Sequence, residues 1–279
     1  MEPGIKLQSL LMFEAYLRAE EKSRNTVEKY VRNARAFMRY AAGRPMEKGL
    51  VMEYKAFLAM GRKPASANSM LASLNAFLRF TGRPDCCVKP YKVQRQTYCP
   101  EEKELTRAEY ARLVGAAKSR GNERLCLLLQ TICGTGIRVS ELASVTVEAA
   151  RRGEAVVNCK GKVRTIFLVA GLRRKLLQYA AKNGIASGAI FITRRGKPIH
   201  RCSVWREMKA LCGQAGVRPA KVFPHNLRHL FARTFYHMEK DIAKLADILG
   251  HSSIQTTRIY IVSTGAEHRR QMERMRLIL

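Results

Sequence analysis

Residues 134–142 read GTGIRVSEL. The stretch comes after an apolar run, LCLLLQTIC, over residues 125–133. The two glycines end the helix that this apolar run predicts. Arg138 then opens a new segment, and Glu141 stands three residues later, at the spacing of neighbours on a helix surface. Taken alone, this pair is what an ordinary surface helix carries, so its meaning depends on other segments of the chain.

Three later segments also carry side chains that chemistry could use. They are the turn CKGK at residues 159–162, the sequence PHNLRH at residues 224–229, and LGH at residues 249–251 with Tyr260 beyond it. Each has an ordinary interpretation by itself: a solvated turn charge, a helix start with a salt-bridging arginine, and a helix C-cap with a core aromatic. The order of all four segments needs one explanation.

The first part of the chain has helical patterning. Apolar residues recur at the spacing of one helix face in successive segments up to residue 84. Within them, Asn25 and Glu28 predict the N-terminal cap of one helix. We therefore expect a small helical bundle over residues 1–84. Prolines and mixed charge then predict a linker over residues 85–104.

A second domain is expected over residues 105–279. Thr106 and Glu109 predict a capping box at its first helix. Most of this domain is helical in pattern, but residues 154–169 and 190–199 are β-prone runs around turns, which predict two small hairpins. The expected fold class is α+β, mostly α with small β-hairpins.

The charge of the chain favours a polyanionic partner. Lysine and arginine number 51 against 22 acidic residues, a net charge of +29. Residues 1–84 carry a net charge of +8 and residues 105–279 carry +21, while the stretch between them is neutral. Basic side chains bind nucleic acid because each neutralised phosphate releases condensed counterions. Ribosomal or membrane-surface binding would also suit this charge.

Other chemistries find less support in the sequence. The 8 cysteines form no C-x-x-C pair, so we expect reduced thiols and no zinc site. The sequence has no cluster of carboxylates for a two-metal nuclease and no phosphate-binding loop of the G-x-x-x-x-G-K-[ST] type. No apolar stretch approaches the length of a membrane span, which predicts a cytoplasmic protein without a membrane partner.

Together the four segments resemble the tyrosine recombinase, or phage integrase, family. The shared features are T-G-I-R-V-S-E-L, a K-G-K hairpin, H-x-L-R-H, and L-G-H with a tyrosine nine residues beyond. The likeness is strongest to Xer-type recombinases and compact integrases, and it extends over nearly the whole chain. It implies that residues 1–84 are a core-binding, SAM-like domain and that residues 105–279 are the catalytic domain.

The resemblance implies a role for each matching residue. Arg138 and Arg228 match the paired arginines that hold the scissile phosphate. Tyr260 matches the nucleophile that forms a 3′-phosphotyrosyl intermediate. His225 occupies the first histidine position of the family, and His251 occupies its His/Trp position.

Three further residues complete the implied site. Glu141 matches an acidic position that supports the site, and Lys160 matches the hairpin lysine that protonates the leaving group. The hairpin tip is one residue shorter than the common G-K-G-x-K-x-R pattern. Lys160 and Lys162 therefore both stay candidates for the general acid.

Phosphoryl chemistry explains these residue types. Attack by a phenol on a phosphodiester builds a second negative charge, which two arginines can hold through forked hydrogen bonds at any physiological pH. A phenol has an ordinary pKa of about 10, so a neighbouring histidine and cations must help it lose its proton. The covalent intermediate retains the bond energy, so neither a metal nor ATP is required.

The family also implies partners. We expect double-stranded DNA with short inverted-repeat core sites, and a homotetramer on DNA formed by exchange of the C-terminal segment. The family likewise implies a bacterial or phage-type, nucleoid-associated location. Two alternatives stay open: a type IB topoisomerase-like or hairpin resolvase activity with the same chemistry, and a DNA-binding scaffold without catalysis. Relaxation of supercoils by a monomer would indicate a topoisomerase, whereas a scaffold has no need of the whole set of catalytic residues.

Overall fold

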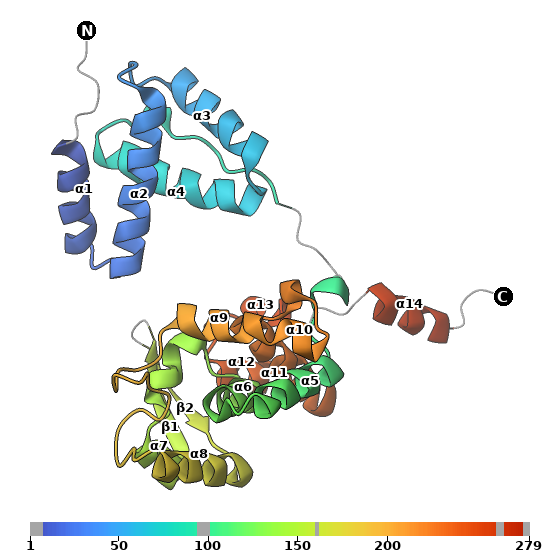
Figure 1. Ribbon diagram of the computed structural model, residues 1–279. Coiled ribbons are helices and arrows are strands. Elements are labelled where there is room, and N and C mark those ends of the chain that lie inside the picture. Colours follow the sequence, from blue (N-terminus) through green and yellow to red (C-terminus); the bar gives the residue numbers. More distant parts are fainter. Residues whose placement is uncertain (1–7, 94–100, 160–161, 261–264, 276–279) are drawn as a thin grey trace. The chain divides into compact units, whose positions relative to one another are not determined.

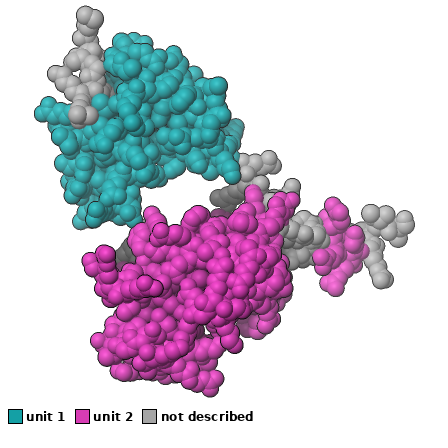
Figure 2. All heavy atoms as spheres, viewed as in Figure 1, with its two compact units in different colours: residues 1–95 teal, residues 96–279 magenta. Residues whose placement is uncertain are grey.

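The computed structural model describes residues 8–93, 101–159, 162–260 and 265–275. The chain divides into two compact units, residues 1–95 and 96–279 (Figure 2). The boundary falls within the stretch whose composition indicates a linker. The fold is mostly α with a small two-stranded sheet (Figure 1).

Unit 1 is a helical bundle. Its helices are α1 (Gln8–Ala19), α2 (Arg24–Ala41), α3 (Lys48–Gly61) and α4 (Pro64–Phe80). Its core is mostly aliphatic, and within it the rings of Phe13 and Phe77 meet edge to face with centroids 5.1 Å apart. The cap predicted at Asn25 is wrong. Helix α2 begins at Arg24, whose guanidinium pairs with Glu28 at 2.8 Å, so that carboxylate does not cap the backbone.

Two asparagines of α4 hold the segment that leaves unit 1. Asn75 accepts from the backbone N–H of Val88 at 3.0 Å and donates to its carbonyl at 2.8 Å. Two turns earlier on α4, Asn68 makes the same two bonds with the backbone of Tyr91, at 2.7 and 2.9 Å. Each asparagine amide pairs with the backbone as a neighbouring β-strand would, because its NH2 group donates and its oxygen accepts. The chain therefore stays packed on unit 1 as far as Tyr91.

Unit 2 contains the remaining helices and the sheet. The helices are α5 (Arg107–Ser119), α6 (Glu123–Thr135), α7 (Val147–Arg152), α8 (Ala170–Lys182), α9 (Arg201–Ala210), α10 (Cys212–Ala215), α11 (Pro224–Glu239), α12 (Ile242–Leu249), α13 (Ile254–Arg258) and α14 (Gly265–Arg274). Helix α6 runs through the core, and α5, α8 and α11 pack around it. The capping box predicted for the first helix is confirmed, because Thr106 and Glu109 make both of its hydrogen bonds.

The predicted hairpin at residues 154–169 is formed by β1 (Glu154–Cys159) and β2 (Lys162–Phe167), which pair antiparallel. It lies beside α7 at one end of unit 2 (Figure 1). The shorter hairpin predicted at residues 190–199 is present only in minimal form, as one antiparallel bridge between Ile192 and Pro198 with a hydrogen bond from Thr193 N–H to the carbonyl of Lys197 at 2.8 Å. A proline cannot donate to a strand ladder, which prevents regular pairing there.

Two kinds of feature are absent from the described residues. No helix among them is both long and apolar enough to cross a membrane. No group of three or more His, Cys, Asp or Glu side chains in the described ranges is placed to hold a metal ion.

Candidate active site

The turn after α6 places Arg138. Gly136 ends the helix with φ +65°, and a Cβ added there would lie 2.5 Å from the ring of Phe231. Only glycine suits both the conformation and the space. Arg138 then caps η3, a 3₁₀ helix over Val139–Ser144. This tight turn lets Arg138 and Glu141 face each other within one segment.

Glu141 joins two arginines. Its carboxylate accepts from the backbone N–H of Arg138 at 2.9 Å and from the guanidinium at 2.8 Å, and it accepts from Arg164 of β2 at 2.5 Å. Burial to 5% exposure tends to raise the pKa of Glu141, but the hydrogen bonds from Arg138 and the charge of Arg164 lower it on balance. The carboxylate therefore stays ionised and fixes both arginines.

Gly250 lets the end of α12 lie against Arg138 and Arg164. It has φ +64°, and a Cβ there would lie 2.3 Å from Cδ of Arg164. The Arg164 side chain occupies the space that a larger residue would need, and it also donates to the carbonyl of Ile248 at 3.4 Å. Arg138 donates to the carbonyl of Gly250 at 3.5 Å. The next residue after this close contact is His251.

Arg228 lies beneath the site on α11 and is 1% exposed. One terminal nitrogen donates to the carbonyl of Gly136, and the other donates to the carbonyl of Leu249 at 2.7 Å. Its buried Nε has no hydrogen-bond partner within the part of the chain that the structure describes. Burial, with the charge of Arg138, lowers the pKa of Arg228 to about 10, so it stays a cation. Carbonyl groups from two helix ends thus hold the guanidinium in place.

His251 continues this network. Its Nε2 lies 3.0 Å from a terminal nitrogen of Arg228, and its Nδ1 lies 2.9 Å from the hydroxyl of Thr257. An arginine can only donate, so Nε2 accepts and the ring carries its proton on Nδ1. Burial and the charge of Arg228 lower the pKa of His251 to about 4, which agrees with a neutral ring.

Tyr260 lies two residues beyond the end of α13 and is 7% exposed. Its hydroxyl lies 3.2 Å from Nε2 of His225. The guanidinium carbon of Arg228 lies 5.7 Å from the centre of its ring. Burial, then the charges of Arg228 and Arg138, lower the pKa of His225, so that imidazole favours the neutral form. A neutral His225 can accept a proton from the phenol.

The structure therefore brings together most of the residues singled out from the sequence. Contacts link the following six into one group: Arg138, Glu141, His225, Arg228, His251 and Tyr260. Lys160 lies outside the described residues. Lys162 is the first residue of β2, and its side chain is not described.

Comparison with known proteins decides the family. The model of the Phage integrase family matches residues 103–267, more than half of the chain. The chain belongs to this family. Among similar proteins, the recombinase is 29% identical to "Tyrosine recombinase XerA" of Pyrococcus furiosus, over 99% of this chain and 97% of that one. It is 30% identical to the XerA of Thermococcus kodakarensis, over 95% and 94%.

Solved structures agree with the family. A crystal structure of XerA recombinase matches the recombinase with a TM-score of 0.55 and 25% identity, covering 98% of this chain and 99% of that one. A lambda integrase dimer bound to a COC′ core site matches with a TM-score of 0.75 at 20% identity, over 94% and 97%. The second likeness bears on the fold alone. The protein is a tyrosine recombinase with the architecture of this family.

Two residues of the candidate site, Arg164 and His229, are not predicted from the sequence. Arg164 binds Glu141, and its sequence signal was available, because it occupies the R of the family's G-K-G-x-K-x-R pattern. His229 stacks on Tyr260 with ring centroids 4.2 Å apart and an angle of 18° between the planes. It stands directly after Arg228 in the H-x-L-R-H segment, but nothing in the sequence indicates a stacking partner 31 residues along the chain.

Proposed function

We propose that this tyrosine recombinase cleaves and rejoins duplex DNA at defined sites, with Tyr260 as the nucleophile. The observation that carries this proposal is the pairing of the Tyr260 hydroxyl with His225 at 3.2 Å, with the buried guanidinium carbon of Arg228 at 5.7 Å from the centre of the same phenol ring. A phenol beside both a neutral imidazole and an arginine is suited to attack a phosphodiester.

In the first step His225 takes the proton of the Tyr260 hydroxyl, and the phenolate oxygen attacks the scissile phosphorus. Arg138 and Arg228 donate to the non-bridging oxygens, where the charge of the transition state develops. Removal of one such donor commonly costs about 10²–10³ in rate. The unpartnered Nε of Arg228 is a donor with capacity for a phosphate oxygen. Glu141 keeps Arg138 aimed at the phosphate, and His251 does the same for Arg228.

In the second half of the step the bond from phosphorus to the 5′-oxygen breaks. A lysine of the hairpin, Lys160 or Lys162, gives its proton to that oxygen. The product is a 3′-phosphotyrosyl bond and a free 5′-hydroxyl. A 5′-hydroxyl from a second strand reverses the chemistry and releases Tyr260, so the reaction consumes no ATP. Two guanidiniums supply the positive charge that a metal ion supplies in other phosphoryl transferases, so we propose no metal cofactor.

Duplex DNA with short inverted-repeat core sites is the proposed substrate. The net charge of +29 supports a polyanionic partner. Related structures include XerH recombinase bound to a difH substrate and lambda integrase bound to a core site. We assign unit 1 the role of a core-binding domain and unit 2 that of the catalytic domain.

Recombination needs two sites in one complex, and we propose a homotetramer formed by exchange of the C-terminal segment. Helix α14 and the residue after it carry exposed apolar side chains, Met272 and Met275, that could bind a neighbouring copy. Mass photometry of the protein on two-site DNA should then show four protomers, and complexes of only one or two would contradict this.

We also propose a nucleoid-associated cytoplasmic location for the protein. A fluorescent fusion that does not overlap the nucleoid would argue against this location.

Trapping of the covalent intermediate tests the proposed reaction. Adducts between the protein and genomic DNA are captured under denaturing conditions, and the attached fragments are sequenced to find the cleavage site. A duplex with this site and a nick beside the scissile phosphate then loses its short 5′-hydroxyl fragment, so the adduct accumulates. We expect the adduct with the wild type and its loss in Tyr260→Phe. Cleavage spread evenly over all sequences, with supercoils relaxed by monomers, would instead indicate a topoisomerase.

A further inference from the structure

We propose that His229 is a positioning residue that holds the ring of Tyr260 in the plane needed for attack. The proposal rests on the proposed function of Tyr260 and adds a residue to it. The two rings lie parallel within 18°, with centroids 4.2 Å apart. This is a face-to-face contact, whereas His225 meets the same phenol edge-on at 65° and 5.2 Å.

The two histidines restrain different motions of the phenol. They stand four residues apart on α11 and so share one helix face, where their own rings are 4.9 Å apart and nearly perpendicular. The hydrogen bond with His225 fixes where the Tyr260 hydroxyl lies, but it allows the ring to swing about that point. Stacking on His229 fixes the plane of the ring. The main chain beneath it is held by the bond from Tyr260 N–H to the carbonyl of Thr257 at 2.9 Å.

The surroundings of His229 favour stacking over acid–base chemistry. Burial, then the charges facing the ring from His225, Arg233 and Arg228, lower the pKa of His229 to about 4. The ring is therefore neutral at physiological pH. Its nitrogens make no hydrogen bond to another described residue, and the phenol hydroxyl pairs with His225. His229 therefore contacts Tyr260 through the flat face of its ring and not through a nitrogen.

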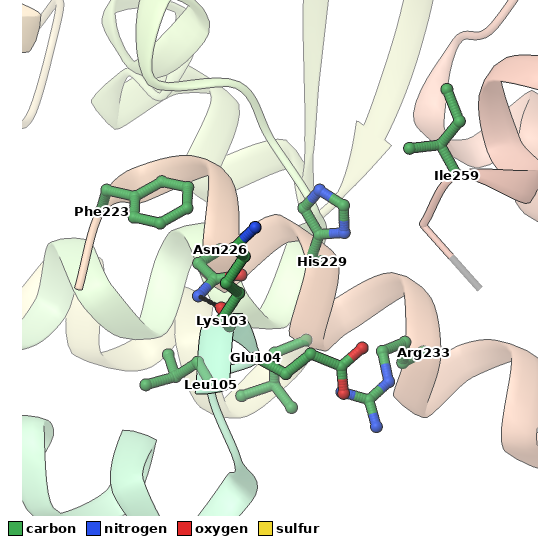
Figure 3. Close-up of a pocket in the computed structure, with 9 residues that line it drawn as sticks. Lys103, Glu104, Leu105, Phe223, Asn226, His229, Arg233 and Ile259 are labelled. Carbon is green, nitrogen blue, oxygen red and sulfur yellow. Dashed lines mark hydrogen bonds and ion pairs between the residues drawn. The ribbon is translucent and has the colours of Figure 1, made fainter. Parts of the chain in front are cut away.

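The cavity beside His229 shows why a smaller side chain would not serve. His229, Phe223, Leu230 and Ile259 line a cavity of about 150 Å³ together with the ion pair of Arg233 and Glu104 (Figure 3). Ile259 is the residue directly before Tyr260. Removal of the imidazole would enlarge this cavity at the contact with the phenol, so the Tyr260 ring would gain space to rotate. A displacement of about 1 Å in a reacting group can cost about 10² in rate.

The test compares three replacements of His229 on the nicked duplex recovered by adduct mapping. Phe keeps a flat ring and removes both nitrogens, Ala removes the ring, and Gln keeps polarity without a ring. With saturating DNA, we expect His229→Phe to form the adduct within about 3-fold of the wild-type rate. His229→Ala and His229→Gln should each be slower by about 10- to 100-fold. The DNA concentration for half-maximal rate should not change in any of them, because the ring acts on Tyr260 and not on binding.

Four outcomes would overturn the proposal. Wild-type rates in both His229→Ala and His229→Gln would mean that the stack has no role. Equal loss in His229→Phe and His229→Ala would assign the function to the ring nitrogens. Faster cleavage in His229→Ala would mean that the stack holds Tyr260 in a resting position. A changed DNA requirement with an unchanged rate at saturation would place His229 in DNA binding.

Two controls show whether an effect on the rate comes from the contact between His229 and Tyr260. His237→Ala changes an exposed histidine on the same helix and should leave the rate unchanged. A readout that needs no DNA checks the geometry itself: the ¹H–¹³C signal of the His229 ring should lose its ring-current shift in Tyr260→Leu, and an unchanged signal would contradict the stack. If wild-type protein forms no adduct while this shift is present, the proposed function fails and the contact stands.

Discussion

At the scale of single residues, the proposed reaction makes activation of Tyr260 depend on the charge state of His225. Burial and the charges of Arg228 and Arg138 hold the pKa of His225 below its ordinary value of 6.5. A lowered pKa keeps the imidazole neutral, and able to take a proton, in mildly acidic solution. We expect the rate of adduct formation to fall on acidification with a midpoint below pH 6.5. Single-turnover rates on both sides of this pH check it, and a decline centred above pH 6.5 would contradict a buried base.

Glu141 gives a prediction of stability. Its pKa is lowered in the folded protein, so its contribution to stability is present above the unfolded pKa of about 4.3 and is lost as the pH falls through the folded value. Glu141→Gln leaves Arg138 and Arg164 close together without their shared anion. Loss of one partner from a buried pair costs about 3 kcal/mol. Urea unfolding at pH 7 should show this loss, and the variant should lose less stability than the wild type on acidification. Equal acid sensitivity would contradict the role of Glu141.

At the scale of elements, the glycine that ends α12 controls the arrangement of the arginines. Gly250→Ala adds a Cβ that would overlap the side chain of Arg164 and also places alanine at φ +64°. We expect a loss of about 2–4 kcal/mol in the free energy of unfolding together with slower cleavage. The matched control is Gly216→Ala, which has φ +58° but open space around its Cβ. It should lose only about 1 kcal/mol and keep its activity. Equal effects in thermal unfolding and cleavage assays would mean that the overlap with Arg164 does not matter.

Most of the helices and strands could be predicted from the sequence. Helical periodicity predicted the helices, and the two β-prone runs joined by a Lys-Gly-Lys turn at residues 154–169 predicted the hairpin β1–β2. The cap at Thr106 was predictable because both partners lie within one turn. The cap at Asn25 was not, because a neighbouring arginine competes for Glu28. At residues 190–199 the predicted hairpin is limited to one bridge, because Pro198 cannot donate to a strand ladder.

Contacts between segments far apart in the sequence are the part of the candidate site that could not be predicted. The order of its motifs predicted that Arg138, Arg228 and Tyr260 would share one site. It did not predict which carbonyl groups hold Arg228, since these belong to the ends of α6 and α12, which meet only in the folded chain. The stacking of His229 depends in the same way on where α13 ends. The hairpin lysine stays a prediction from the motif.

At the scale of the whole molecule, charge should dominate the affinity for DNA. Residues 1–84 and 105–279 are both basic, with net charges of +8 and +21. If the protein neutralises about 6–10 phosphates, its affinity should fall by about 10³–10⁵ between 50 and 200 mM salt. Fluorescence anisotropy with a labelled duplex measures this dependence. An affinity that changes less than about 10-fold would mean that apolar or base contacts hold the DNA.

The identity of the nucleophile is the central claim, and mass spectrometry of the trapped adduct tests it most directly. The adduct formed on the nicked duplex is digested with nuclease and protease, and the peptide that carries the residual nucleotide is fragmented. We predict a nucleotide linked through its 3′-phosphate to Tyr260. A nucleotide on any other residue, or an adduct of the same yield in Tyr260→Phe, would contradict the account.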